Sequence, residues 1–350
     1  MRLVLTEHLK EGDIIAKDII SYEGGILLCH NTRFREVFRD KLIERNILEV
    51  YIEDEVSKGI EPNRILEPSA KQKITQDVQL QFYNLQNDLA LDSEGLSNIA
   101  NFLIEQLSQK ELILELEDLK VNDQYTYEHC IAVALLTEVV CDKLNINLEQ
   151  KAQIVMGALI HDIGKIIIPK DILNKPSCLT SREYKTIKDH AELGYMMVKE
   201  DRTLSAITKL IVLCHHERED GSGYPLGKGQ ELHIGVKIVA ACDVFHALIS
   251  DRCYRQGLPI EEVIDIVKKE AINPEIREII EHSFACYPVG AMVCLNDGNI
   301  AIVEQNFATD IKRPIVRVLK REKGKIIQTC TINLKTQREY YITGRYYNEI

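Results

Sequence analysis

The sequence predicts a mainly α protein, with a long helical core between a small α+β module at the start and a small β module at the end. Apolar residues recur at spacings of three and four over much of residues 71–282, whereas short alternating apolar segments follow Pro288. With 350 residues, 45% of them hydrophobic, the chain has enough apolar surface for more than one core. We expect four segments: residues 1–68, a small α+β module; residues 69–119, a helical linker or dimerisation segment; residues 120–284, the helical core; and residues 285–350, a small β module.

The first two segments carry different periodicities. Residues 1–68 predict a strand near Leu3, a turn at Gly24–Gly25, a helix over Arg33–Arg45 and a strand over Leu48–Ile52. From residue 71 the apolar positions follow one helical face. This stretch therefore either links two domains or mediates the formation of a homodimer.

The helical core and the β module are delimited by turn signals. We expect core helices over Tyr127–Leu144, Ala152–Ile160, Leu204–Cys214 and Val236–Ile249, with loops around Pro169–Ser181 and Glu217–Leu232. In the β module, Asn296-Asp297-Gly298 predicts a hairpin turn between Met292–Leu295 and Ile300–Glu304. Further strands are expected at Ile315–Leu319 and Ile326–Ile332.

Charge and cysteine content exclude several classes of protein. Lys plus Arg number 43 against 54 Asp plus Glu, a net charge of -11, so the electrostatic footprint of a protein that binds duplex nucleic acid is missing. The ten cysteines include no CxxC pair, which is typical of reduced thiols in the cytoplasm. Apolar stretches such as Ile154–Ile160 are too short to span a membrane, so we expect a soluble, cytoplasmic protein.

Histidines and aspartates gather in the helical core. Imidazole and carboxylate without thiolate suit octahedral manganese or iron, or else zinc. The set is larger than one metal ion needs, which indicates two. Its members are His129, His161, Asp162, His190, His215, His216 and Asp243.

Helical spacing favours two metal sites. His161-Asp162 closes one predicted helix, so Asp162 is placed to bridge two ions while His161 binds one. His215-His216 closes another, and neighbouring side chains on a helix point roughly 100° apart, so they suit different metals. Two metals about 3.5 to 4 Å apart clamp a phosphoryl group and generate a hydroxide at neutral pH. Phosphodiester hydrolysis is the natural reaction.

Each ligand taken alone has a structural alternative. A single core histidine is more often a hydrogen-bonded structural residue than a ligand, and this holds for His129 and for His190. Asp243 lies in an apolar helix, where an unpaired carboxylate is costly to bury, so a metal or cation partner is favoured. His246, three residues later, either supports a ligand or is a surface residue.

Two strings resemble the HD-GYP family of HD-domain phosphohydrolases. These are HDIGK at 161–165 and HHEREDGSGYP at 215–225, and the resemblance covers about residues 120–284. It implies an HD-domain helical bundle, hydrolysis of cyclic di-GMP to pGpG and/or GMP, and a cofactor of two divalent metal ions, iron or manganese. The seven core histidines and aspartates carry over as the metal ligands.

The resemblance also implies roles at the substrate. Lys165 would stabilise the charge that develops on the scissile phosphate or protonate the leaving oxygen. Arg252 and Arg255 match positions where relatives hold substrate phosphates, although bare arginines are more often surface charges. The loop residues Gly221, Gly223, Tyr224 and Pro225 either shape the substrate site or form a docking surface for signalling proteins.

The sequence departs from the family pattern at three positions. Tyr125 stands where relatives with a third metal carry glutamate, so we expect two metals. Cys253 replaces a usual proline, and His246 replaces the second aspartate of a DxFDA stretch. Neither change removes a predicted ligand, but both alter the surroundings that set substrate preference.

Two other functions stay open. The same metal chemistry serves cyclic GMP-AMP or a mononucleotide equally well, because the HD fold hosts many phosphohydrolases. Alternatively, the domain only binds the dinucleotide, as a sensor or docking module. The complete ligand set with Lys165 favours hydrolysis, since a pure binder has no need of an activated water.

Overall fold

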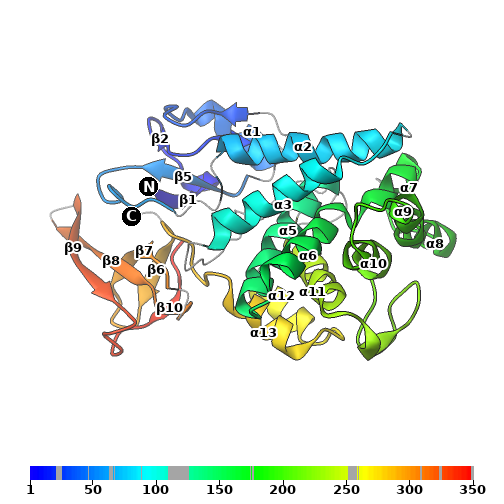
Figure 1. Cartoon of the computed structure of the whole chain (residues 1–350). Coiled ribbons are helices and arrows are strands. Elements are labelled where there is room, and N and C mark those ends of the chain that lie inside the picture. Colours follow the sequence, from blue (N-terminus) through cyan, green and yellow to red (C-terminus); the bar gives the residue numbers. More distant parts are fainter. Residues whose placement is uncertain are drawn as a thin grey trace. The chain divides into compact units, whose positions relative to one another are not determined.

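The computed structural model describes residues 1–20, 26–45, 47–62, 66, 68–87, 89–108, 126–173, 175, 177–250, 258, 260–307, 310–322 and 325–347 (Figure 1). The chain forms two compact units, one of residues 65–283 and the other of residues 1–64 together with 284–350. Within the described residues, no helix is long and apolar enough to cross a membrane.

Residues 65–283 are helical, which confirms the predicted mainly α core. Helices α2 and α3 come first, and helices α5 to α13 follow (Figure 1). The α-helices are α2 Pro68–Gln86, α3 Ser93–Ser108, α5 Thr126–Lys143, α6 Leu148–Ile160, α7 Lys170–Leu173, α8 Ser181–Lys188, α9 His190–Val198, α10 Ala206–Cys214, α11 Ile234–Ile249, α12 Ile260–Val267 and α13 Pro274–His282. The short 3-10 turns are η3 Ile163–Ile167 and η4 Gly229–Glu231.

Helix α5 is the centre of this unit. Every residue from His129 to Cys141 is buried, as expected for a helix that is apolar on all sides. It packs against α6 and α11, and α6 in turn packs against α10. The first turn of α5 therefore places His129 inside the core.

Two helices that lead into the site have defined ends. Asn147 caps α6 by accepting a hydrogen bond from the Gln150 amide, and Ser205 caps α10 by accepting one from the Thr208 amide. The last residues of these helices are Ile160 and Cys214. The HD pair and the HH pair thus begin where the helices end, as the sequence predicts.

The described residues of 1–64 and 284–350 form three antiparallel sheets. In the first sheet the strand order is β1 (Arg2–Leu5), β5 (Glu49–Glu53) and β2 (Ile14–Ile15). In the second sheet β3 (Ile19–Ile20) pairs with β4 (Ile26–Leu28). In the third sheet the strand order is β10 (Ile342–Arg345), β6 (Met292–Leu295), β7 (Ile300–Gln305), β8 (Ile315–Glu322) and β9 (Lys325–Asn333). The predicted hairpin at residues 296–298 and the strands around it are present.

The two terminal segments form one compact unit, although the sequence treats them as separate modules. The Tyr51 hydroxyl donates to the Val289 carbonyl at 3.0 Å, and Arg345 forms an ion pair with Glu49 at 2.6 Å. Ile60 is buried among residues of β6 to β9. Long-range contacts of this kind leave no local sequence signal.

The predicted helix over Arg33–Arg45 is wrong in its first half. Arg33 forms an isolated β-bridge with Ile14, and the Phe34 amide donates to the Asp13 carbonyl at 2.7 Å. The chain becomes helical only at η2 Glu36–Phe38 and α1 Arg39–Glu44. The Gly24–Gly25 turn and residues 109–119 lie outside the described residues.

Candidate metal centre

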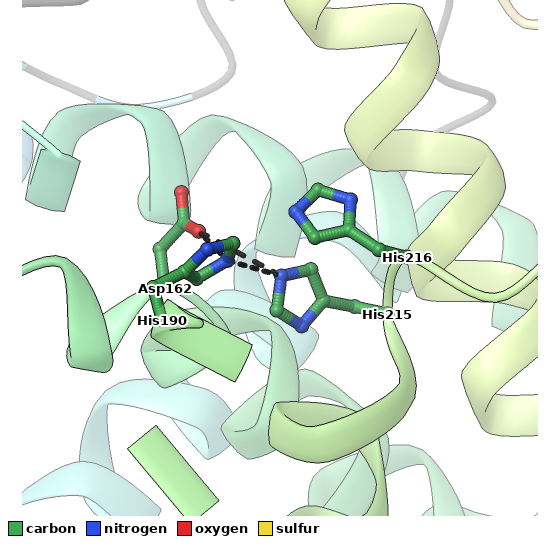
Figure 2. Close-up of side chains that lie close together, drawn as sticks. All are labelled: Asp162, His190, His215 and His216. Carbon is green, nitrogen blue, oxygen red and sulfur yellow. Dashed lines mark hydrogen bonds and ion pairs between the residues drawn. The ribbon is translucent and has the colours of Figure 1, made fainter. Parts of the chain in front are cut away.

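Asp162 lies at the centre of the histidine cluster. The residue follows the end of α6 and is only 1% exposed. Its Oδ2 lies 2.6 Å from Lys165 Nζ and 3.4 Å from His161 Nε2. Its Oδ1 lies 3.2 Å from His190 Nε2 and 3.7 Å from His215 Nε2 (Figure 2). One carboxylate thus faces two sets of imidazoles.

The first group of ligand atoms comes from Asp162, His190, His215 and His216, all within 4.8 Å of one another (Figure 2). His190 begins α9, and the other two histidines follow α10. His190 Nδ1 donates to the Ile187 carbonyl at 2.6 Å, and His215 Nδ1 donates to the Val212 carbonyl at 3.0 Å. A carbonyl only accepts, so these contacts leave the Nε2 atoms to face the site.

The lone pairs of these two rings converge. His190 Nε2 lies 3.1 Å from His215 Nε2, and in neutral rings with a proton on Nδ1 both of these atoms carry lone pairs. Asp162 Oδ1 adds a third lone-pair atom at the same point. Three acceptors at such distances repel one another unless a cation lies among them.

The second group consists of His129, His161 and Asp243, again within 4.8 Å. His129 Nε2 lies 3.0 Å from Asp243 Oδ1, and His161 Nδ1 donates to the Ala158 carbonyl at 2.8 Å. Asp162 Oδ2 lies 3.6 Å from His129 Nε2 and so joins this group to the first. Cys130, next to His129, also comes within 4.8 Å of His161 and Asp162, a neighbour that the sequence reasoning missed.

The residues present fit divalent metal ions. His161 Nε2 and Asp162 Oδ1 are fully buried and have no hydrogen-bond partner within the described residues. Orphaned polar atoms of this kind are costly unless a ligand satisfies them. Burial lowers the pKa of His216 to about 3, and burial together with neighbouring histidines holds the pKa of His215 well below its usual range. Neutral imidazoles of this kind are the form that binds metal.

Asp162 and His161 influence each other's protonation. Burial opposes ionisation of Asp162, but Lys165 and His161 outweigh it and hold its pKa well below the usual value. Burial likewise favours neutral His161, but the carboxylate of Asp162 outweighs it and raises the pKa of His161. A metal ion held by His161 Nε2 would have to displace a proton from this ring.

His215 and His216 lie side by side, and their assignment to two different metal ions stays a prediction. Their ring centroids lie 4.2 Å apart, and both rings supply atoms to the first group. Helix α10 ends at Cys214, so the two side chains extend past the helix and converge on the same pocket. His216 Nδ1 also lies 3.5 Å from Asp243 Oδ2, which places His216 at the border of both groups.

The GYP loop is folded around one buried carboxylate. Glu217, 1% exposed, accepts hydrogen bonds from the amides of Gly227 at 3.0 Å and Lys228 at 3.2 Å. The ring of Tyr224 stacks on His216 with 4.7 Å between centroids, and the Tyr224–Pro225 peptide is cis. The loop thus covers the site with an aromatic ring.

Two glycines of this loop are required by its geometry. A Cβ on Gly223 would lie 2.4 Å from the Glu217 Cα, so only glycine allows this approach of the backbone. Gly221 has φ of +79°, in the left-handed region. The close approach therefore requires glycine at position 223, and the positive φ favours it at position 221.

Lys188 is a cation at the edge of the site that the sequence reasoning missed. Its Nζ lies 4.5 Å from the ring centroid of Tyr224 and 4.9 Å from that of Tyr184. Within the described residues no carboxylate forms an ion pair with Lys188. Its position two residues before His190 is the sequence signal that could have identified Lys188 as a residue near the site.

The predicted residues Arg252 and Arg255 lie outside the described residues, as do Tyr125 and Cys253. The structure brings together all seven predicted metal ligands and places Lys165 against Asp162.

Comparisons with known proteins agree with this fold. A family model described as HD domain matches residues 99–276, half of the chain. The chain therefore belongs to the HD domain family, which confirms the resemblance drawn from the sequence.

Curated relatives extend the comparison. A cyclic di-GMP phosphodiesterase of Pseudomonas aeruginosa is 33% identical over 235 residues, 65% of this chain and 57% of its own length. The 3'3'-cGAMP-specific phosphodiesterase 1 of Vibrio cholerae is 36% identical over 155 residues, 43% of this chain and 35% of its own length. The chain thus spans little more than half of the first relative and about a third of the second.

A solved HDG"Y"P protein from Bdellovibrio bacteriovorus has a similar fold. The TM-score is 0.52 at 15% identity, and the match covers 80% of this chain and 97% of that chain. At this identity the likeness concerns the fold alone.

Proposed function

We propose that this chain is a metal-dependent phosphodiesterase that hydrolyses cyclic di-GMP to pGpG and/or GMP. The observation that carries the proposal is the convergence of His190 Nε2, His215 Nε2 and Asp162 Oδ1, at 3.1 and 3.2 Å, on a point that calls for a cation. The named activity of the Pseudomonas relative supports the choice of substrate.

Seven residues form the proposed ligand set for two divalent ions, iron or manganese. Asp162 joins the two groups, because its two oxygens face different histidines. When bound, such ions supply Lewis acidity and lower the pKa of water towards neutrality. The ligands are His129, His161, Asp162, His190, His215, His216 and Asp243.

Lys165 is the proposed group for the scissile phosphate. Its ammonium lies 2.6 Å from Asp162 Oδ2, and its side chain is 22% exposed, so it borders both the ligands and the solvent. From there it stabilises charge on the phosphate oxygens or gives a proton to the leaving oxygen. Both roles need the ammonium form, which the neighbouring carboxylate favours.

Other residues are proposed to hold the substrate. Lys188 adds positive charge beside the site in a chain whose net charge is -11, and an anionic dinucleotide needs such local cations. Tyr184, 52% exposed, offers a ring on which a base can stack. Arg252 and Arg255 are proposed to bind phosphates, and the loop from Gly221 to Pro225 to shape the pocket.

A second candidate substrate is cyclic GMP-AMP. The 36% identity to a Vibrio cholerae phosphodiesterase named for that substrate favours it, and the same phosphodiester chemistry applies. A sensor that binds the dinucleotide without cleaving it is the remaining alternative.

The test is chromatographic. Purified protein loaded anaerobically with Fe(II) or Mn(II) is incubated with cyclic di-GMP and, separately, with cyclic GMP-AMP. Asp162→Ala removes the carboxylate that joins the two groups, and Glu149→Gln, on the exposed surface of α6, is the matched control. We expect pGpG or GMP from the wild type and the control and none from Asp162→Ala. Dinucleotide binding without product would leave the sensor as the better account.

Further predictions go with this function. We propose that residues 120–284 contain the whole catalytic site and that the protein works in the cytoplasm. A homodimer formed through residues 69–119 and a signalling partner docked on the loop Gly221–Pro225 stay predictions.

A further inference from the structure

The metal-facing histidines differ in what holds their rings. His161, His190 and His215 each donate from Nδ1 to a backbone carbonyl, and that carbonyl belongs to the residue three positions earlier. His129 lies in the first turn of α5, and its Nδ1 faces a side chain instead, His246 of α11. His246 is one turn beyond Asp243 on the same helix.

The contact between the two rings is short and buried. The Nδ1 atoms of His129 and His246 lie 2.8 Å apart, and the two residues are 2% and 0% exposed. At this distance two imidazole nitrogens share one proton, so one ring donates and the other accepts. Besides His129, His246 contacts the Ser250 hydroxyl oxygen, which lies 3.3 Å from its Nδ1 and 3.2 Å from its Nε2.

The direction of this hydrogen bond decides whether His129 can bind a metal. Its Nε2 faces the site, 3.0 Å from Asp243 Oδ1 and 3.6 Å from Asp162 Oδ2. A metal ligand needs a lone pair on that atom, so the ring proton must lie on Nδ1 and His246 must accept it. The His246 proton then lies on Nε2, where the Ser250 hydroxyl oxygen, 3.2 Å away, accepts it.

The opposite tautomer competes in the same pocket. With the proton on Nε2, His129 would donate to Asp243, and the two groups would satisfy each other without a metal. An acceptor on the far side of the ring works against this arrangement, as a backbone carbonyl does for the other three histidines. His129 is therefore the ligand whose tautomer depends on a replaceable side chain.

We infer that His246 is a positioning residue for the metal centre: it accepts the Nδ1 proton of His129 and so keeps Nε2 free to bind a metal ion. This inference rests on the proposed metal-ligand role of His129. It assigns a structural reason to the histidine that stands where the family pattern has aspartate.

The first experiment measures Mn(II) affinity in the full chain, from the electron paramagnetic resonance signal of free Mn(II). His246→Phe keeps a ring but removes the acceptor, and His246→Asn places an amide oxygen near the position of Nδ1. We expect His246→Phe to weaken Mn(II) binding about tenfold to a hundredfold, and His246→Asn to stay within about threefold of wild type. Equal affinity in the wild type and His246→Phe, or equal losses in both variants, overturns the inference.

A second experiment needs only metal-free wild-type protein. Nitrogen-15 spectra of the imidazole rings distinguish the two neutral tautomers, and the His129 signals are assigned from their loss in His129→Gln. We expect the proton on Nδ1 of His129, and a proton on Nε2 overturns the inference. If wild-type protein binds no Mn(II), the proposed metal centre fails, yet this spectrum still decides the direction of the His129–His246 hydrogen bond.

Discussion

Glu138 makes the stability of this protein depend on pH at a place separate from the metal ligands. It lies on α5, is 1% exposed, and its Oε1 is 3.4 Å from Lys151 Nζ on α6. Lys151 bonds more closely to Asp142, at 2.8 Å. Burial raises the pKa of Glu138 from 4.5 to about 7, and the weaker attraction of Lys151 offsets only part of the effect.

The sign of the effect follows from proton binding. Between pH 4.5 and about 7 the folded protein keeps the Glu138 proton, whereas the unfolded chain has released it. The folded state binds more protons there, so this group's contribution to the free energy of unfolding falls as pH rises through that window. At 1.36 kcal/mol per pH unit, the loss is about 3 kcal/mol, to order of magnitude.

Glu138→Gln removes that proton and leaves the Lys151–Asp142 pair in place. We expect the free energy of unfolding of the variant, minus that of wild type, to grow by about 3 kcal/mol between pH 4.5 and about 8. Urea unfolding of chelator-treated protein at several pH values measures it, with Glu149→Gln as the exposed control on α6. A difference that stays constant with pH would refute the reasoning.

Three further predictions concern the site and its loop. Lys165→Met should lower kcat about a hundredfold to a thousandfold. The metal content, measured by mass spectrometry, should stay unchanged. A kcat near that of the wild type would remove Lys165 from the proposed chemistry. Gly223→Ala places a Cβ 2.4 Å from the Glu217 Cα. We therefore expect a loss of about 1 to 3 kcal/mol in the free energy of unfolding, measured as a lower midpoint of thermal unfolding. An unchanged midpoint would contradict the tight approach of the two backbone segments. Lys188→Met should raise KM about tenfold with little change in kcat. Lys185 is an exposed lysine on the same helix, and Lys185→Met should change neither constant. Equal effects of the two substitutions would mean that Lys188 acts only through net charge.

The sequence by itself determines most of the helical core and the composition of the site. Helices α5, α6, α10 and α11 begin and end within a few residues of the predicted positions, because their apolar runs and caps are local signals. The HD and HH pairs are recognisable as candidate metal ligands because each is a string of adjacent residues. The helix predicted from Arg33 fails at its start because a β-bridge to Ile14 overrides the local pattern.

Only the tertiary structure shows how the predicted metal ligands are divided into groups. Helical spacing predicts different metal ions for His215 and His216. The structure shows that both rings contribute atoms to the group of Asp162 and His190, and that His216 also lies 3.5 Å from Asp243 of the second group. It also joins the two terminal segments in one compact unit through contacts such as that of Tyr51 with Val289.

His246 shows the physical reason most plainly. From the sequence it is either a support for a ligand or a surface residue, because the periodicity of an apolar helix does not say which neighbour a polar side chain meets. Only the packing of α11 against α5 buries it 2.8 Å from His129. Residue types and their positions along the chain thus predict which chemistry the site performs. Contacts between residues that are distant in the sequence determine which partner each ring nitrogen has.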